Sequence, residues 1–100
     1  MDPRELRTVA AQIRLLVLDV DGVLTDGRLY YDADGRETKS FHVRDGYGIQ
    51  QVLAAGLLVA VISGRRSTAA AARLAELQVP HVFLGWNDKR QVLEQLLAEL

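Results

Sequence analysis

Two unbroken apolar segments constrain the fold of this chain more than any other feature. Residues 15–18 are Leu-Leu-Val-Leu, and residues 57–62 are Leu-Leu-Val-Ala-Val-Ile. Neither shows the polar alternation of a strand with one face in water, so both predict strands of a parallel sheet, the first of them buried on both faces. A third strand is predicted over 81–84, directly after Pro80.

Predicted helices alternate with these strands. Asp2 and Pro3 form a start signal, Gly56 marks an end, and Ser67 or Thr68 caps a third helix. Strands alternating with helices predict right-handed βαβ crossovers, and therefore a single Rossmann-like α/β domain with three layers over residues 1–100. The predicted helices cover roughly 3–11, 45–55, 67–78 and the segment from Asn87 or Asp88 to Leu100.

A hairpin interrupts the alternation. Residues 28–31 and 37–41 flank the segment 32–35 (Asp-Ala-Asp-Gly), which predicts a β-hairpin with an Asp-Gly turn over about 28–41. An isolated two-stranded hairpin has only marginal stability in water. We therefore expect its apolar side chains to form a contact surface, and not to project into solvent at the sheet edge. Those side chains are Leu29, Tyr30, Tyr31 and Phe41.

The composition excludes several classes of function. The chain has 100 residues, 49% of them hydrophobic, which suffices for one small core. Its 12 basic and 13 acidic side chains give a net charge of -1, without the basic excess of a general nucleic-acid binder. It has no cysteine, no signal peptide and no apolar segment of the ~20 residues that span a bilayer. We expect a soluble, cytoplasmic protein that binds neither nucleic acid nor membranes.

Polar residues follow each of the three predicted strands. Asp19 and Asp21 follow the first strand, residues 63–65 (Ser-Gly-Arg) the second, and residues 87–89 (Asn-Asp-Lys) the third. Because ligands of open parallel sheets bind outside the carboxyl ends of the strands, these three groups are expected at one rim. The sequence therefore predicts a site built from separate segments.

The chemistry of the rim is best defined by Asp19 and Asp21. Side chains alternate along an extended chain, so both carboxylates can point to one place, where a Mg²⁺ ion would offset their repulsion. One carboxylate can attack phosphorus, and the other can protonate the departing alkoxide and then activate water. Gly22 permits a tight turn close to a phosphate.

Each motif alone has a plainer explanation. Asp-Gly after a strand can be a simple turn, and Ser63-Gly64 can be an ordinary link from strand to helix. Lys89 opposes the dipole of the predicted last helix, but Asp88 and solvent can balance its charge. A calcium-binding loop is disfavoured because Val23 occupies a ligand position. The combination at one rim carries the hypothesis.

These residues also carry a family resemblance. Residues 19–27 (Asp-Val-Asp-Gly-Val-Leu-Thr-Asp-Gly) resemble the first motif of the haloacid dehalogenase superfamily, residues 61–65 (Val-Ile-Ser-Gly-Arg) resemble its second, and Lys89 stands where the third motif has its lysine. With residues 41–49 (Phe-His-Val-Arg-Asp-Gly-Tyr-Gly-Ile), the chain is most similar to 3-deoxy-D-manno-octulosonate 8-phosphate (Kdo 8-phosphate) phosphatases. The likeness extends from about residue 13 to residue 100.

The resemblance implies a role for each matching residue. Asp19 would be the nucleophile and Asp21 the general acid and base, with the Asp19 carboxylate and the Asp21 carbonyl holding Mg²⁺. Ser63 and Gly64 would bind the phosphoryl group, and Lys89 would neutralise its charge. Arg65 is similar to the arginine that these enzymes direct at the sugar acid, whereas phosphatases of sialic-acid-type 9-phosphates tend to have glutamate there.

The resemblance also implies the setting of this activity. Small members lack a cap domain, and their hairpin supports a homotetramer in which a neighbouring subunit helps to close the site. The reaction would be Mg²⁺-dependent hydrolysis of Kdo 8-phosphate through an aspartyl-phosphate, in lipopolysaccharide biosynthesis of a Gram-negative bacterium.

One motif of the family is missing. The acidic fourth motif, which completes the metal site after a further strand, is not reached before Leu100. We therefore expect that the C-terminal part of the fold is missing and that the strand at 15–18 has an open edge. The activity is still expected to be that of a phosphatase, although an incomplete metal site can leave this chain inactive. A non-catalytic assembly domain is the main alternative. A receiver-like signalling domain is disfavoured because it lacks a general acid at the position of Asp21.

Overall fold

The central sheet has three parallel strands. The computed structural model describes residues 1–100, and its strands β1 (Leu15–Leu18), β4 (Leu58–Ser63) and β5 (His81–Leu84) lie in the order β1-β4-β5. β4 is central and pairs in register with both neighbours, Leu16 opposite Val59 and Ile62 opposite Phe83. The predicted parallel sheet is confirmed.

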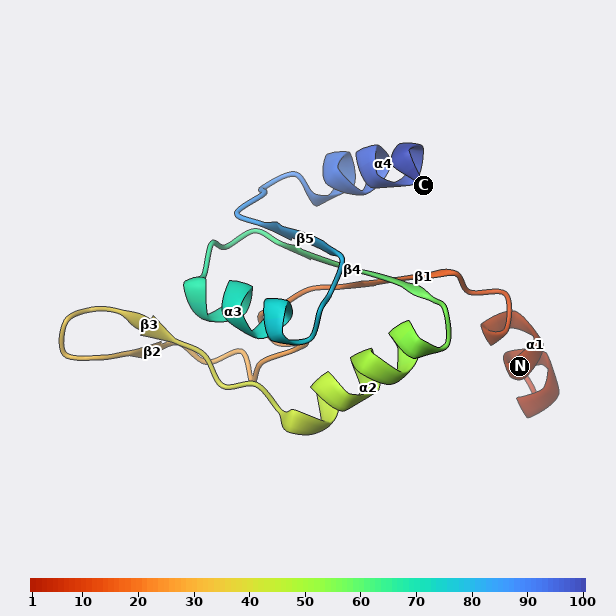
Figure 1. Cartoon of the computed structure of the whole chain (residues 1–100), viewed down its shortest axis with the longest axis horizontal. Coiled ribbons are helices and arrows are strands. Elements are labelled where there is room, and N and C mark those ends of the chain that lie inside the picture. The colour runs from red at the N-terminus through yellow and green to blue at the C-terminus, as the bar shows by residue number, and fades with distance from the viewer.

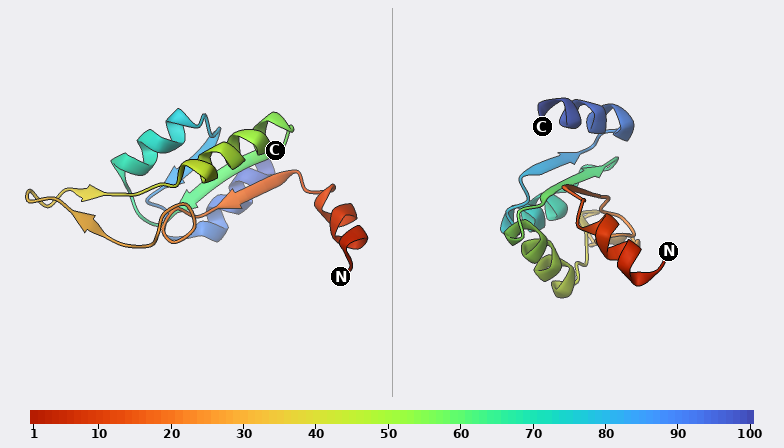
Figure 2. Two further views of the ribbon diagram at one scale, coloured as in Figure 1. Left: turned by 90° about the horizontal axis from the view of Figure 1, so that it is seen from below. Right: turned by 90° about the vertical axis from the view of Figure 1, so that its right-hand side faces the viewer.

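Helices cover both faces of the sheet, as the predicted three layers require. Helices α2 and α3 pack on one face, and α4 lies on the other (Figures 1 and 2). α1 lies beyond the sheet, contributes no buried residue, and marks the end of the molecule opposite the hairpin. No helix combines the length and the apolar character that crossing a bilayer requires. The helices are α1 (Pro3–Ala10), α2 (Val43–Ala54), α3 (Thr68–Glu76) and α4 (Lys89–Glu99).

Side-chain caps set the helix starts. The Asp2 carboxylate accepts from the N–H groups of Arg4 and Glu5, the Ser67 hydroxyl accepts from Ala70, and the Asp88 carboxylate accepts from Gln91. These bonds satisfy amides that have no partner within the helix. α2 begins two residues earlier than expected, because the ring of His42 caps it through the N–H of Arg44.

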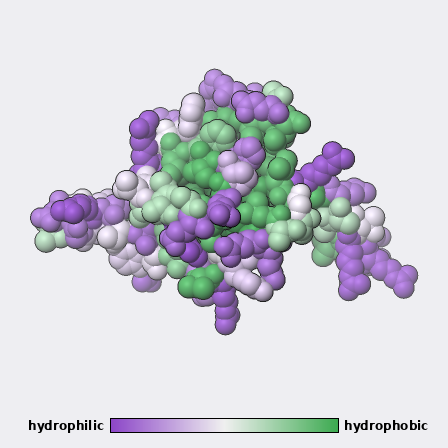
Figure 3. All heavy atoms as spheres, in the orientation of Figure 1, coloured by the Kyte–Doolittle hydropathy of each residue, from purple (hydrophilic) through white to green (hydrophobic).

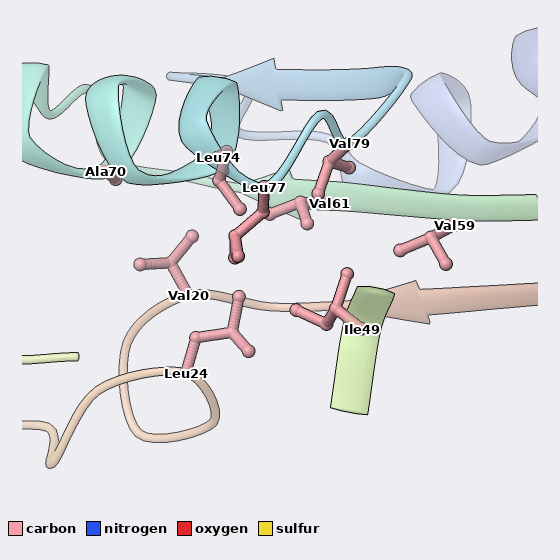
Figure 4. Packing of buried hydrophobic residues seen from close by; sticks show 9 residues of the cluster. All are labelled: Val20, Leu24, Ile49, Val59, Val61, Ala70, Leu74, Leu77 and Val79. Carbon is pink, nitrogen blue, oxygen red and sulfur yellow. The ribbon is translucent and has the colours of Figure 1, made fainter. Parts of the chain in front are cut away.

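The core lies between β4 and the two helices on its lower face in Figure 1. Val59, Ala60 and Val61 of β4 are fully buried, and Leu74 of α3 packs against the same strand (Figure 4). Val20, from the loop after β1, also points into this cluster. The nine clustered residues are Val20, Leu24, Ile49, Val59, Val61, Ala70, Leu74, Leu77 and Val79.

The expectation that the 15–18 strand is buried on both faces is wrong. None of its residues is fully buried, and Val17 is 39% exposed. β1 pairs only with β4, so one of its edges is open, whereas β4 is enclosed by neighbours on both sides. Apolar surface gathers over the middle of the molecule, between a largely hydrophilic hairpin tip and a largely hydrophilic α1 (Figure 3).

The hairpin is present, and its turn lies at the expected segment 32–35. Its paired strands are only β2 (Tyr30–Tyr31) and β3 (Glu37–Thr38). Asp32 and Arg36 close a three-residue loop in which Gly35 has φ +78°, the geometry of a type I turn followed by a bulge. The Asp32 carboxylate accepts from the N–H groups of Asp34 and Arg36, which favours this longer loop over a two-residue turn.

Two glycines of α2 provide a matched test of packing. A Cβ at Gly46 would overlap the Arg73 guanidinium and lie 2.9 Å from Cδ2 of the buried Leu77, whereas a Cβ at Gly48 would meet nothing within 4 Å. Gly48→Ala should therefore raise the free energy of unfolding by about 0.5–1 kcal/mol through helix propensity. Gly46→Ala should lower the free energy of unfolding by about 1 kcal/mol, because the cost of overpacking exceeds the gain in helix propensity. Urea denaturation of both variants tests this, and two shifts of equal sign would contradict it.

Candidate active site

Asp19 and Lys89 meet at the rim where the strands end. Asp19 follows β1 and Lys89 opens α4, yet Lys89 Nζ lies 2.9 Å from Asp19 Oδ2 across 70 positions of sequence. The ion pair borders an open cavity of about 280 Å³ that Val17, Ile62 and Leu93 also line. The structure thus brings together the two predicted site residues that are farthest from one another in the chain.

The loop after β1 is fixed through its middle residue. The Val20 side chain is buried, and its carbonyl oxygen accepts from the N–H groups of Val23, Leu24 and Thr25. With Val20 turned into the core, Asp19 and Asp21 on either side are left partly exposed. Gly22 takes φ +79°, a conformation that other residues rarely adopt, which explains why Asp-Gly closes this loop.

Ser63 lies at the end of β4, next to the loop that leads to α4. It is 2% exposed, and its carbonyl oxygen accepts from the N–H groups of Gly85 and Trp86. Its hydroxyl oxygen accepts from Arg65 N at 3.3 Å, so its hydroxyl hydrogen remains available to an acceptor such as a phosphoryl oxygen. Gly64, the next residue, is exposed.

Two charged residues of the hairpin join the site without having been predicted. Lys39 Nζ lies 2.6 Å from Asp21 Oδ1 and 2.7 Å from Glu37 Oε1. The first contact is a hydrogen bond, whereas the second has only the geometry of an ion pair. Glu37 Oε2 in turn accepts from Arg65 Nη2 at 2.7 Å. A continuous series of charges therefore joins Asp21 to Arg65 through β3 and the residue that follows it.

The contacts among Lys39, Glu37 and Arg65 shift the pKa values of these three groups. Burial alone would lower the pKa of Lys39, but its contacts with Asp21 and Glu37 raise it above the ordinary value. The pKa of Glu37 is lowered, chiefly by Lys39 and then by Arg65. The pKa of Arg65 is raised by the Tyr31 hydroxyl and by Glu37. All three groups are therefore charged at neutral pH.

The donor atoms at the rim suit a hard cation. No cluster of three carboxylate or imidazole groups gathers anywhere in the chain. The Asp19 carboxylate is partly exposed, and the backbone carbonyl oxygen of Asp21 accepts no hydrogen bond. Mg²⁺ in phosphoryl-transfer sites uses one or two carboxylates and completes its shell with water and phosphate oxygens. The residues present fit that pattern.

Comparison with known proteins places these features in a wider group. No family model matches the chain. It is 45% identical over 93 residues to the 3-deoxy-D-manno-octulosonate 8-phosphate phosphatase of Salmonella typhi, an alignment that covers 93% of this chain and 50% of that protein. The chain therefore spans about half the length of the curated relatives it matches.

Two solved structures share the fold. The 3-deoxy-D-manno-octulosonate 8-phosphate phosphatase of Yersinia pestis is 43% identical, with a TM-score of 0.88 over 92% of this chain and 50% of that one. The Moraxella catarrhalis enzyme of the same name, solved with a magnesium ion, a phosphate ion and Kdo, is 38% identical, with a TM-score of 0.90 over 98% of this chain and 56% of that one. The resemblance inferred from the motifs is confirmed: the chain has the haloacid dehalogenase-type fold and is similar to 3-deoxy-D-manno-octulosonate 8-phosphate phosphatases over about half of their length.

Proposed function

We propose that this chain is the catalytic part of a Mg²⁺-dependent phosphatase that hydrolyses Kdo 8-phosphate to Kdo and inorganic phosphate. The meeting of Asp19 and Lys89 at the rim carries the proposal, because it joins a carboxylate nucleophile to a cation that can neutralise a phosphoryl group. The likeness to phosphatases of this name supports the choice of substrate.

The residues at the rim suggest a division of labour. An Asp19 oxygen attacks phosphorus, the bond from phosphorus to the sugar oxygen breaks, and Asp21 gives its proton to the departing alkoxide. Asp21 then takes a proton from the water that cleaves the aspartyl-phosphate, which restores both carboxyl groups. Lys89 and the Ser63 hydroxyl stabilise the charge on the transferring group, beside the exposed backbone of Gly64.

The Asp19 carboxylate and the Asp21 carbonyl oxygen would hold the Mg²⁺ ion. When bound, the ion orients the phosphoryl group and neutralises negative charge on its oxygens. Arg65 would face the carboxylate of the sugar acid, since a guanidinium pairs well with a planar carboxylate. Glu37 holds that guanidinium at 2.7 Å in this structure.

The setting inferred from the resemblance forms part of the same proposal. Residues 1–100 would be one haloacid dehalogenase-type domain with its hairpin at about 28–41, acting in the cytoplasm as part of a homotetramer in lipopolysaccharide biosynthesis. The exposed apolar residues of the hairpin, Leu29, Tyr30 and Tyr31, support a contact with another subunit.

One observation favours a second candidate, a domain that assembles without turnover. No third acidic side chain gathers beside Asp19 and Asp21, so a metal held there has few protein ligands. Titration with Mg²⁺, followed by Trp86 fluorescence or by NMR, separates the candidates, because a domain used only for assembly has no need of the ion.

Release of inorganic phosphate from Kdo 8-phosphate, measured with Mg²⁺ and again with EDTA, tests the proposed function. We expect turnover with Mg²⁺ and its loss on chelation, because the charge on the transferring group is then no longer offset. Kdo itself, which has no phosphate, serves as the blank. A folded chain without turnover would contradict the proposal and favour the assembly domain.

A further inference from the structure

Lys39 is the most deeply buried charge beside the proposed site, and its surroundings are asymmetric. Its side chain is 2% exposed and lies between two carboxylates, those of Asp21 and Glu37, which are themselves 30% and 19% exposed. A lysine is almost never buried to this extent unless it is paired. The buried position of Lys39 therefore depends on the carboxylates of both Asp21 and Glu37.

The contact with Asp21 engages one carboxylate oxygen and leaves the other free. Lys39 Nζ bonds Asp21 Oδ1 at 2.6 Å, whereas Asp21 Oδ2 has no hydrogen bond within the chain. An exposed ion pair is loosely held, whereas a buried lysine paired on both sides has little freedom to move and so restrains the carboxylate oxygen to which it bonds. With Oδ1 restrained, the directions open to the unbonded Oδ2 are fewer.

The hairpin is what carries Lys39 to this place. Lys39 directly follows β3, and the hairpin projects beyond the carboxyl ends of the sheet strands, on the side where the site lies (Figures 1 and 2). Glu37 lies two positions earlier, on the same side of the extended chain. It forms an ion pair with Lys39 and accepts a hydrogen bond from Arg65. Glu37 and Lys39 thus tie the hairpin to two loops of the site.

We propose that Lys39 is a positioning residue that holds the Asp21 carboxyl group where its free oxygen can serve the departing alkoxide. The inference rests on the proposed phosphatase function and assigns to the hairpin a part in the chemistry, in addition to any part in assembly. Lys39 touches Asp21 and not the reacting atoms, so it acts through the general acid.

The inference predicts a dependence on the leaving group. An alkoxide departs from Kdo 8-phosphate and needs a proton, whereas the nitrophenolate of p-nitrophenyl phosphate departs without one. Because a general acid contributes about 10²–10⁴-fold, Lys39→Met should lower kcat/KM for Kdo 8-phosphate by about 10²-fold. For p-nitrophenyl phosphate, kcat/KM reports phosphorylation of Asp19 alone and should change less than about threefold.

Separate values of kcat and KM distinguish the possible roles of Lys39. Because Glu37 holds Arg65, a loss that acts through Arg65 and the sugar acid should raise KM for Kdo 8-phosphate, and a change in KM alone would overturn the inference. Loss of the positioned acid should lower kcat.

Arg36→Met removes an exposed cation from the same hairpin and should leave both substrates unaffected. Lys39→Arg keeps the charge and should restore part of the loss. If Lys39→Met unfolds the chain, Lys39→Gln, which keeps a hydrogen-bond donor between the two carboxylates and leaves Glu37 in place, is used instead.

Equal losses on both substrates would assign Lys39 a merely structural role and overturn the inference, as would no loss on either. Those results leave the phosphatase function standing, since the unmodified chain still turns over. An unmodified chain without turnover overturns the proposed function and the inference with it.

Discussion

Asp19→Asn is expected to reduce phosphate release from Kdo 8-phosphate by about 10⁴-fold or more, because it removes the nucleophile. The amide has nearly the same shape as the carboxylate but lacks its negative charge, and it cannot form the aspartyl-phosphate. Lys89 would also lose the anion that lies 2.9 Å from its ammonium group. Phosphate release under saturating Mg²⁺ measures the effect.

Asp34→Asn is the matched control for this substitution. This substitution makes the same change from carboxylate to amide, but in the hairpin loop, where Asp34 pairs with the exposed Arg36. It should retain the activity of the unmodified chain. An Asp19→Asn chain that keeps activity within tenfold of the original would show that another group attacks phosphorus.

Leu74→Ala is expected to lower the free energy of unfolding by about 2–5 kcal/mol. Leu74 is 0% exposed and lies in the cluster that joins α3 to β4, so the substitution leaves a cavity that the surrounding side chains fill only in part. Small domains have about 5–15 kcal/mol of stability in total, so this loss is a large fraction of it. The midpoint of urea denaturation, followed by circular dichroism, measures the loss.

Leu97→Ala provides the control for the core substitution. Leu97 on α4 is 53% exposed, so truncation of its side chain should change the free energy of unfolding by about 0.5 kcal/mol or less. Similar losses in the two variants would mean that the cluster around Leu74 does not hold the domain together.

The parts of the fold that local patterns determine could be predicted from the sequence. The apolar segment before Ser63 forms β4, and Ser67 and Asp88 cap the helices for which their side chains are suited. The meeting of Asp19 with Lys89 was also predictable, because parallel strands bring their carboxyl ends to one rim. The start of α2 was missed because histidine is an uncommon cap.

What could not be predicted depends on how distant segments pack. The exposure of Val17 follows from β1 having one neighbour, which an apolar pattern does not reveal. Glu37 and Lys39 face the same side of an extended chain, a spacing visible in the sequence. Their contact with Asp21 depends on where the hairpin lies, and 18 positions separate Lys39 from that aspartate. Buried pairing of this kind is a property of the assembled fold.

The position of β1 at the edge of the sheet bears on how long the site keeps its shape. Regions of a folded protein open locally at different free energies, and a strand held along one side opens more readily than one held along both. Asp19 directly follows β1, while Ser63 ends the enclosed β4. Fraying of β1 would carry Asp19 away from Lys89 while Ser63 stayed in place. The ladder between Leu15–Leu18 and Leu58–Val61 is therefore the sheet contact that keeps Asp19 beside Lys89.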